Sequence, residues 1–307
     1  MIDHAHHPRD HGHGGHALKN FGAAFAVGTL LNAALVVLQI VYGAIAHSVA
    51  LLADAAHNFG DVLGLIVAWS AYLLAQRRPT ERYTYGFRST SILAALFNAV
   101  FVLVATGAIA WQAIERLFDP EPVAAVTVMA VAAVGIVING LTAWMLMEDP
   151  RGDLNIRGAY VHMLADAAVS AGVVVAGAVI FLTGWPWADP LASIVISAVI
   201  VWTTWGLLRR AVSMSLQAVP EAIAPDQVRI YLESLPGVAG VHDIHIWSMS
   251  TTETALTCHL VMPQGHPGDE FLAQLDRELG RQFNIAHPTI QIEFGDHDCR
   301  LAPSHIV

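Results

Sequence analysis

Two pairs of ionisable residues lie within long apolar stretches of this 307-residue sequence. His57 is followed four residues later by Asp61, and His162 is followed at the same spacing by Asp166. Residues four apart share one face of an α-helix, so each pair would present an imidazole and a carboxylate side by side. Ionisable side chains are costly inside a membrane and are functional candidates by default. The two pairs are therefore the strongest candidates for a functional site.

Two imidazole nitrogens and two carboxylate oxygens form a four-coordinate set suited to Zn²⁺, with bonds of about 2.0–2.2 Å. The carboxylates would also balance the charge of the ion in surroundings of low dielectric constant. The alternative is two hydrogen-bonded His–Asp pairs that only pack helices together. Because the pattern occurs twice where other charge is scarce, we favour a zinc site at His57, Asp61, His162 and Asp166. Asp54, on nearly the same face as His57, is a candidate to support a ligand, to carry protons or to cap the helix.

The elements that must position these residues are apolar helices. Hydrophobic side chains make up 55% of the chain and charged ones 13%, and the mean hydropathy is +0.53. A globular domain carries about 25% charged residues. A membrane span takes about 20 apolar residues, and six segments qualify: 21–46, 49–75, 91–118, 123–147, 159–183 and 190–208. The composition therefore predicts an α-helical polytopic membrane domain with six transmembrane helices.

Arginines set the predicted orientation of these helices. The second and fourth connections and the segment after the last helix carry Arg77, Arg78, Arg82, Arg88, Arg151, Arg157, Arg209 and Arg210. The first, third and fifth connections contain no Lys or Arg. By the positive-inside rule we expect both termini in the cytoplasm, with the helices in the lipid of a bacterial inner membrane.

Charge and cysteine content exclude other classes. The net charge of −10 disfavours a nucleic-acid partner, because phosphate binding needs concentrated Lys and Arg. The only two cysteines, Cys258 and Cys299, cannot form a disulfide framework and fit a reducing compartment.

From residue 209 onward the sequence has the pattern of a soluble α+β domain. Two segments have helical spacing, residues 225–235 and 269–283, and three predict strands, residues 238–248, 252–262 and 289–294. The α-β-β-α-β order suggests a small ferredoxin-like cytoplasmic domain. We therefore divide the chain into a His-rich tail (1–20), a six-helix transport domain (21–208) and a cytoplasmic metal-binding domain (209–307).

The motifs around these residues resemble those of the cation diffusion facilitator family, the zinc-type proton-coupled metal exporters. The stretch SVALLADAAHNFGD, from Ser48 to Asp61, is similar to the family's second-helix signature. The stretch NIRGAYVHMLAD, ending at Asp166, is similar to its fifth-helix signature, and Asp189-Pro190 with Ser193 resembles the start of the sixth helix. The stretch VHDIHIWS is similar to the first strand of the family's cytoplasmic domain. The resemblance implies a homodimer of six-helix protomers and a membrane zinc site at the two His–Asp pairs.

The resemblance also implies ligands in the cytoplasmic domain. His242, His259 and Glu293 match one zinc site of the family. His287 and Cys299 match part of a second site, which in some members is completed by an N-terminal His/Cys segment. The tail of this chain carries interspersed histidines, which we interpret as a metal-collecting segment: His4, His6, His7, His11, His13 and His16.

The alternation of side chains along a strand predicts which neighbouring residues do not bind the metal. Cys258 must point away from His259 and is expected in the core, and His245 is expected to face opposite to His242. One departure from the family concerns Ser91, which stands where many members carry Glu after a Tyr-Gly-aromatic motif.

These assignments predict a secondary active transporter that exports Zn²⁺ from the cytoplasm in exchange for protons. Metal binding needs deprotonated imidazole and carboxylate, so metal and proton compete for one site. Zn²⁺ is expected both as substrate and as regulatory ligand, with no organic cofactor. The alternatives are a broader exporter that also accepts Cd²⁺, Co²⁺ or Ni²⁺, and a membrane zinc sensor without transport. An intramembrane metalloenzyme is disfavoured, because no His-Glu-x-x-His motif is present and four ligands leave no open position.

Overall fold

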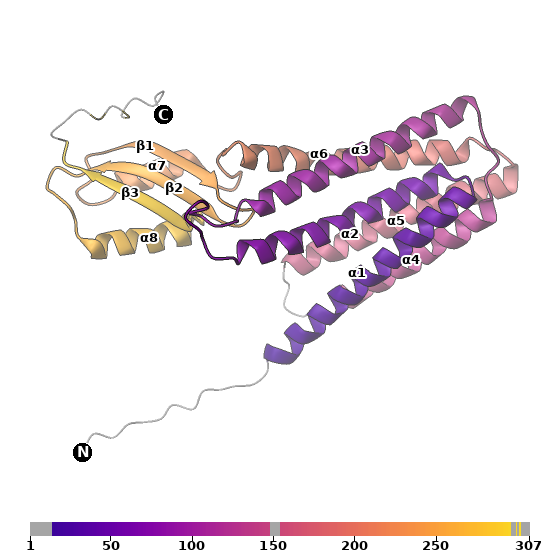
Figure 1. Cartoon of the computed structure of the whole chain (residues 1–307), viewed down its shortest axis with the longest axis horizontal. Helices are drawn as coiled ribbons and strands as arrows, with labels where there is room; N and C mark the ends of the chain where they lie inside the picture. The colour runs from indigo at the N-terminus through magenta and orange to yellow at the C-terminus, as the bar shows by residue number, and fades with distance from the viewer. Residues whose placement is uncertain (1–13, 148–153, 296–298, 300, 302–307) are drawn as a thin grey trace, which may run out of the picture. The chain divides into compact units, whose positions relative to one another are not determined.

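The structure is a computed structural model that describes residues 14–147, 154–295, 299 and 301. Its first six helices are α1 (Gly14–Ile45), α2 (Val49–Ala75), α3 (Thr90–Phe118), α4 (Ala125–Met147), α5 (Leu154–Thr183) and α6 (Ala188–Ser215) (Figure 1). Each predicted span coincides with one of these helices, and all six are long and apolar enough to cross a membrane. Three helices extend well beyond the prediction at one end, since α1 begins at Gly14 rather than residue 21, α5 begins at Leu154 rather than residue 159, and α6 ends at Ser215 rather than residue 208.

The chain divides into two compact units, residues 1–63 with 101–202 and residues 64–100 with 203–307. The division falls inside α2, α3 and α6, so each of these helices contributes to both units. The boundary of the transport domain at residue 208 stays a prediction.

In the first unit, α4 packs along α5 and also contacts α1. The α4–α5 contact depends on small residues, as is usual between membrane helices. A Cβ atom at Gly177 of α5 would lie 2.7 Å from Met129 Cγ and 3.3 Å from the carbonyl oxygen of Ala125, both on α4. A larger residue at this position would therefore force Met129 or the backbone of α4 to shift.

The start of α2 is capped by a side chain of α6. Ser48 Oγ donates a hydrogen bond to the Asp189 carboxylate, which also accepts one from the backbone N–H of Val49 at 2.7 Å. Ser48 Oγ in turn accepts a bond from the N–H of Leu51 at 3.1 Å. These acceptors satisfy backbone donors that the first turn of a helix otherwise leaves free. The contacts fix α2, which carries His57 and Asp61, against the first turn of α6.

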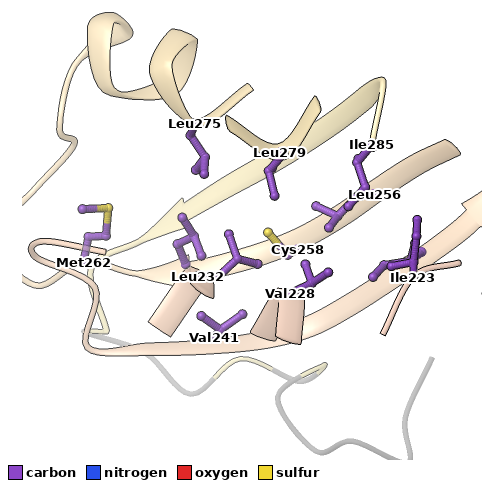
Figure 2. Packing of buried hydrophobic residues seen from close by; sticks show 12 residues of the cluster. Ile223, Val228, Leu232, Val241, Leu256, Cys258, Met262, Leu275, Leu279 and Ile285 are labelled. Carbon is purple, nitrogen blue, oxygen red and sulfur yellow. The ribbon is translucent and has the colours of Figure 1, made fainter. Parts of the chain in front are cut away.

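The second unit contains α7 (Pro225–Glu233), β1 (Gly240–Ser248), β2 (Thr254–Val261), α8 (Asp269–Phe283) and β3 (His287–Glu293). The sheet order is β1-β2-β3, with β1 antiparallel and β3 parallel to β2. This element order confirms the predicted α-β-β-α-β, ferredoxin-like arrangement. Its core lies between the sheet and the helices, with Leu256 and Leu260 of β2, Leu279 of α8 and Leu232 of α7 fully buried. Figure 2 shows Cys258 among these apolar side chains, which confirms its predicted place in the core.

Strand β1 carries a β-bulge that changes the predicted face of His245. His242 pairs with His259, whereas His245 pairs with Thr257, so three residue steps on β1 match two on β2. Asp243 lies in this bulge with a φ of 49°. Paired residues on neighbouring strands share a face, and an extra residue shifts the alternation by one. His245 therefore lies on the same face as His242, and the prediction that it faces the other way is wrong.

Candidate metal sites

Helices α2 and α5 bring the two predicted His–Asp pairs together. His57 Nε2 of α2 lies 3.0 Å from Asp166 Oδ1 of α5, and His162 Nε2 of α5 lies 3.3 Å from Asp61 Oδ2 of α2. The shortest contacts are thus crossed, because each imidazole meets the carboxylate of the other helix. The two imidazole rings lie edge to face with their centroids 6.0 Å apart.

The donor atoms of His57, Asp61 and Asp166 lie within 4.8 Å of one another, close enough to hold one ion. His162 is outside this group of three, although its Nε2 also lies 3.7 Å from Asp166 Oδ2. The His162 side chain is 44% exposed, whereas that of Asp166 is 1% exposed. The four-ligand site therefore stays a prediction, of which the structure brings three members together.

Asp166 is the most buried member of this group. Its Oδ2 atom is buried and accepts no hydrogen bond from any residue that the structure describes. A buried acceptor without a donor is costly, and the cost is higher for a charged group. A cation between α2 and α5 would satisfy this oxygen.

Asp54 is fully buried and lies at the centre of a separate hydrogen-bond network. Its Oδ2 accepts bonds from Gln39 Nε2 of α1 at 2.7 Å and from Ser170 Oγ of α5 at 2.8 Å. Asn58 Nδ2 donates to Gln39 Oε1 at 3.0 Å and lies 3.4 Å from Asp54 Oδ1. Asp54 therefore connects three helices beside the His–Asp pairs, and the cap of α2 is made by Ser48 and Asp189 instead. Neither Asn58 nor Ser170 is among the predicted site residues, although Ser170 lies four residues after Asp166.

The second unit holds another group of donors on its sheet. Donor atoms of His242, His259, Glu293 and Cys299 lie within 4.8 Å of one another. His242 Nε2 is 3.1 Å from Glu293 Oε2, and His259 Nδ1 is 3.0 Å from Glu293 Oε1. Cys299 Sγ lies 3.7 Å from His259 Nδ1. The histidines are direct partners on β1 and β2, and Glu293 ends β3, so the sheet itself aligns these side chains.

The structure separates the two residues assigned by resemblance to a second cytoplasmic site. Cys299 joins His242, His259 and Glu293, whereas His287 lies at the opposite end of β3. The His287 ring stands edge-on to Tyr85, with the centroids 5.6 Å apart. His4, His6, His7, His11 and His13 lie outside the described residues, and of His16 only the backbone, within α1, is described.

Ser91 binds the connection between β1 and β2. Its Oγ accepts a hydrogen bond from the N–H of Thr251 at 3.1 Å, and Arg88 forms an ion pair with Glu253 at 2.7 Å. Ser89 Oγ donates to the carbonyl oxygen of Met249 at 3.1 Å. The start of α3 is thereby joined to the turn that follows β1, the strand that carries His242.

Comparison with known proteins covers both parts of the chain. Residues 25–214 match the family model described as the cation efflux transmembrane domain, and residues 220–294 match the cation efflux protein cytoplasmic domain. The chain is 33% identical to a "Cadmium, cobalt and zinc/H(+)-K(+) antiporter" of Bacillus subtilis, over 85% of this chain and 86% of that protein. It is 34% identical to the zinc transporter ZitB of Escherichia coli, over 88% of each. It is 32% identical to the metal cation efflux system protein CzcD of Cupriavidus metallidurans, over 96% of this chain and 92% of that protein.

Proposed function

Because this chain belongs to the cation diffusion facilitator family of membrane transporters for metal cation efflux, we propose that it exports Zn²⁺ from the cytoplasm in exchange for protons. The main support for the proposal is that the two His–Asp pairs contact each other between α2 and α5. In addition, the buried Oδ2 atom of Asp166 has no hydrogen-bond donor among the described residues. The names of the relatives support it, since one is a zinc transporter and another a cadmium, cobalt and zinc/H(+)-K(+) antiporter.

The crossed contacts suggest how zinc and protons are exchanged. A proton on Nε2 of His57 or His162 is held by a carboxylate of the opposite helix, at 3.0 and 3.3 Å respectively. Zn²⁺ requires the same nitrogen and oxygen atoms in their deprotonated form. Zinc entry therefore releases protons, and protonation from the other side of the membrane ejects the ion. Alternating access would come from movement of the helices that carry the ligands against the rest of the transport domain.

By the distribution of arginines, both termini lie in the cytoplasm and the membrane is a bacterial inner membrane. The protein acts as a homodimer, as the resemblance implies. The His-rich tail collects metal. Zinc at the cytoplasmic site formed by His242, His259, Glu293 and Cys299 regulates transport. It draws the acidic cytoplasmic domains of the two protomers together and so shifts the population of transporter states.

Zinc uptake into proteoliposomes with an acidic lumen tests the exchange. We expect the initial rate of Zn²⁺ uptake to rise with the acidity of the lumen, and the lumen to become more alkaline as zinc enters. A rate of Zn²⁺ uptake that does not depend on the pH gradient, together with an unchanged lumen pH, would contradict proton exchange. Uptake of Cd²⁺, Co²⁺ or Ni²⁺ at comparable rates would establish the broader exporter. A protein that binds zinc but moves none of these ions would be the sensor.

The two cysteines are expected to differ in their reaction with a maleimide. The reactive form is the thiolate, and burial raises the pKa of Cys258 to about 12, so this thiol stays protonated near neutral pH. Cys299 is partly exposed and should be labelled, and saturating zinc should slow its labelling by about tenfold or more, because a metal-bound thiolate is not free to react. Mass spectrometry of the labelled peptides measures both rates.

The His242→Ala variant is the control for this experiment. It leaves Cys299 in place but removes another donor of the group, so zinc should protect Cys299 less. Equal labelling of Cys299 with and without zinc in the unmodified chain would remove Cys299 from the site.

A further inference from the structure

The central imidazole of the cytoplasmic group has different partners on its two nitrogens. His259 Nδ1 faces Glu293 Oε1 at 3.0 Å and Cys299 Sγ at 3.7 Å, within the group of metal donors. Its Nε2 lies 3.3 Å from Asp243 Oδ2, outside that group. A neutral imidazole has one N–H donor and one nitrogen lone pair, so it matters which nitrogen holds the proton. When a metal ion takes the lone pair of Nδ1, the proton lies on Nε2, where the Asp243 carboxylate accepts its hydrogen bond.

We propose that Asp243 is a positioning residue for the cytoplasmic metal site, which acts by fixing the tautomer and ring orientation of His259. Histidines that ligate metals usually donate their other ring N–H to a carboxylate, a carbonyl or water. This inference rests on the proposed binding of zinc by His242, His259, Glu293 and Cys299. It adds a residue that neither strand alternation nor the resemblance selected.

The β-bulge explains how Asp243 reaches this position. In a regular strand Asp243 would point away from its neighbour His242, into the side of the sheet that carries the core. With a φ of 49°, in a region that Asn and Asp enter more readily than most residues, Asp243 instead lies on the face of His242 and His259. Ile244 is then the residue of this segment that packs against the core.

A second histidine orients the Asp243 carboxylate in turn. His245 Nε2 lies 2.9 Å from Asp243 Oδ1, whereas His259 contacts the other oxygen, Oδ2. The His245 side chain is 41% exposed, whereas that of Asp243 is 12% exposed. The more buried carboxylate is therefore fixed between two imidazoles, and the more exposed His245 supports it from the solvent side.

Two substitutions distinguish the role of the Asp243 carboxylate from the role of the positive φ of this residue. Asp243→Gly keeps the freedom for a positive φ and removes the acceptor, whereas Asp243→Asn keeps both the φ preference and an acceptor oxygen. The probe is Co²⁺, which binds N/O/S sites in place of Zn²⁺ and absorbs in the near ultraviolet when a thiolate such as Cys299 is bound. Titration of the purified full-length chain with Co²⁺, and displacement of Co²⁺ by Zn²⁺, gives both affinities at this one site.

We expect Asp243→Gly to weaken Co²⁺ and Zn²⁺ binding by about 10–100-fold, and Asp243→Asn to weaken it less, because the amide oxygen still accepts the N–H. The matched control is Asp226→Asn, an exposed carboxylate in the first turn of α7, which should leave both affinities unchanged.

If Asp243→Gly bound Co²⁺ and Zn²⁺ as tightly as the unsubstituted chain, the proposal would be overturned. The role of Asp243 would then be limited to the backbone conformation of the β-bulge. If Asp243→Gly prevents folding, Asp243→Asn decides: weaker binding supports the role and unchanged binding overturns it. Absence of the thiolate absorption in the unsubstituted chain would instead contradict the metal site itself, and with it the role of Asp243.

Discussion

Replacement of Asp166 by asparagine is expected to abolish zinc transport, with the initial rate of Zn²⁺ uptake into proteoliposomes falling by about 100-fold or more. Loss of a residue that only supports a ligand costs about 10–100-fold in metal affinity or activity, so loss of a ligand should cost at least the upper value. Asp166 lies 3.0 Å from His57 and 3.7 Å from His162, and its carboxylate is almost fully buried. Asparagine has nearly the same volume but offers no negative charge to the ion.

Two comparisons make this result specific. Asp119→Asn, an exposed carboxylate after α3, should transport zinc at the wild-type rate. Asp61→Asn should lose less than Asp166→Asn, because the Asp61 side chain is 33% exposed whereas that of Asp166 is 1% exposed. If the double variant Asp61→Ala/Asp166→Ala moved zinc as fast as the unsubstituted chain, the site would have to lie elsewhere.

Replacement of Asp54 by alanine is expected to lower the free energy of unfolding by about 2–4 kcal/mol and to impair transport. The substitution leaves two buried donors, on Gln39 and Ser170, without their acceptor, and Asn58 keeps only its other partner, Gln39 Oε1. Each buried polar group left unpaired costs about 1–3 kcal/mol, and partial re-pairing among the three side chains reduces the sum. Thermal or denaturant unfolding of the purified protein in detergent measures the change.

Ser170→Ala provides the matched comparison for Asp54. It removes one donor and leaves the Asp54 carboxylate with Gln39, so its cost should be about 1 kcal/mol. In the double variant the two costs should not add, because both residues share one hydrogen bond. An Asp54→Ala protein as stable as the unsubstituted chain would show that the network contributes nothing to folding.

Apolar composition was sufficient to predict the six helices, because a run of about 20 apolar residues is the length that a transmembrane helix requires. It was not sufficient to place their ends. Hydropathy reports the apolar part of a helix, whereas α1 and α6 continue into polar sequence at Gly14 and Ser215. The helical spacing of the His–Asp pairs predicted that each pair shares a face. The crossed contacts depend on how α2 and α5 are rotated about their axes, which the spacing within one helix does not contain.

The cytoplasmic group shows a different limit. Alternation along a strand correctly placed Cys258 in the core, but it failed for His245 because one extra residue reverses the pattern. A bulge formed at Asp243 has a weak sequence signal, since Asp adopts a positive φ only occasionally. Cys299 lies beyond the last strand, so its position beside His259 depends on the path of the chain after β3 rather than on any local pattern.

The contacts between α2 and α5 also restrict how these helices can move. Three polar contacts, here called rungs, join the two helices in antiparallel order: Asp54 with Ser170, His57 with Asp166, and Asp61 with His162. A shear of one helix along the other by a single residue, about 1.5 Å, would misalign all three rungs together. Tilting α2 and α5 as one rigid body leaves every rung intact. The rungs therefore resist sliding of α2 along α5, and a movement that keeps the two helices together breaks none of them.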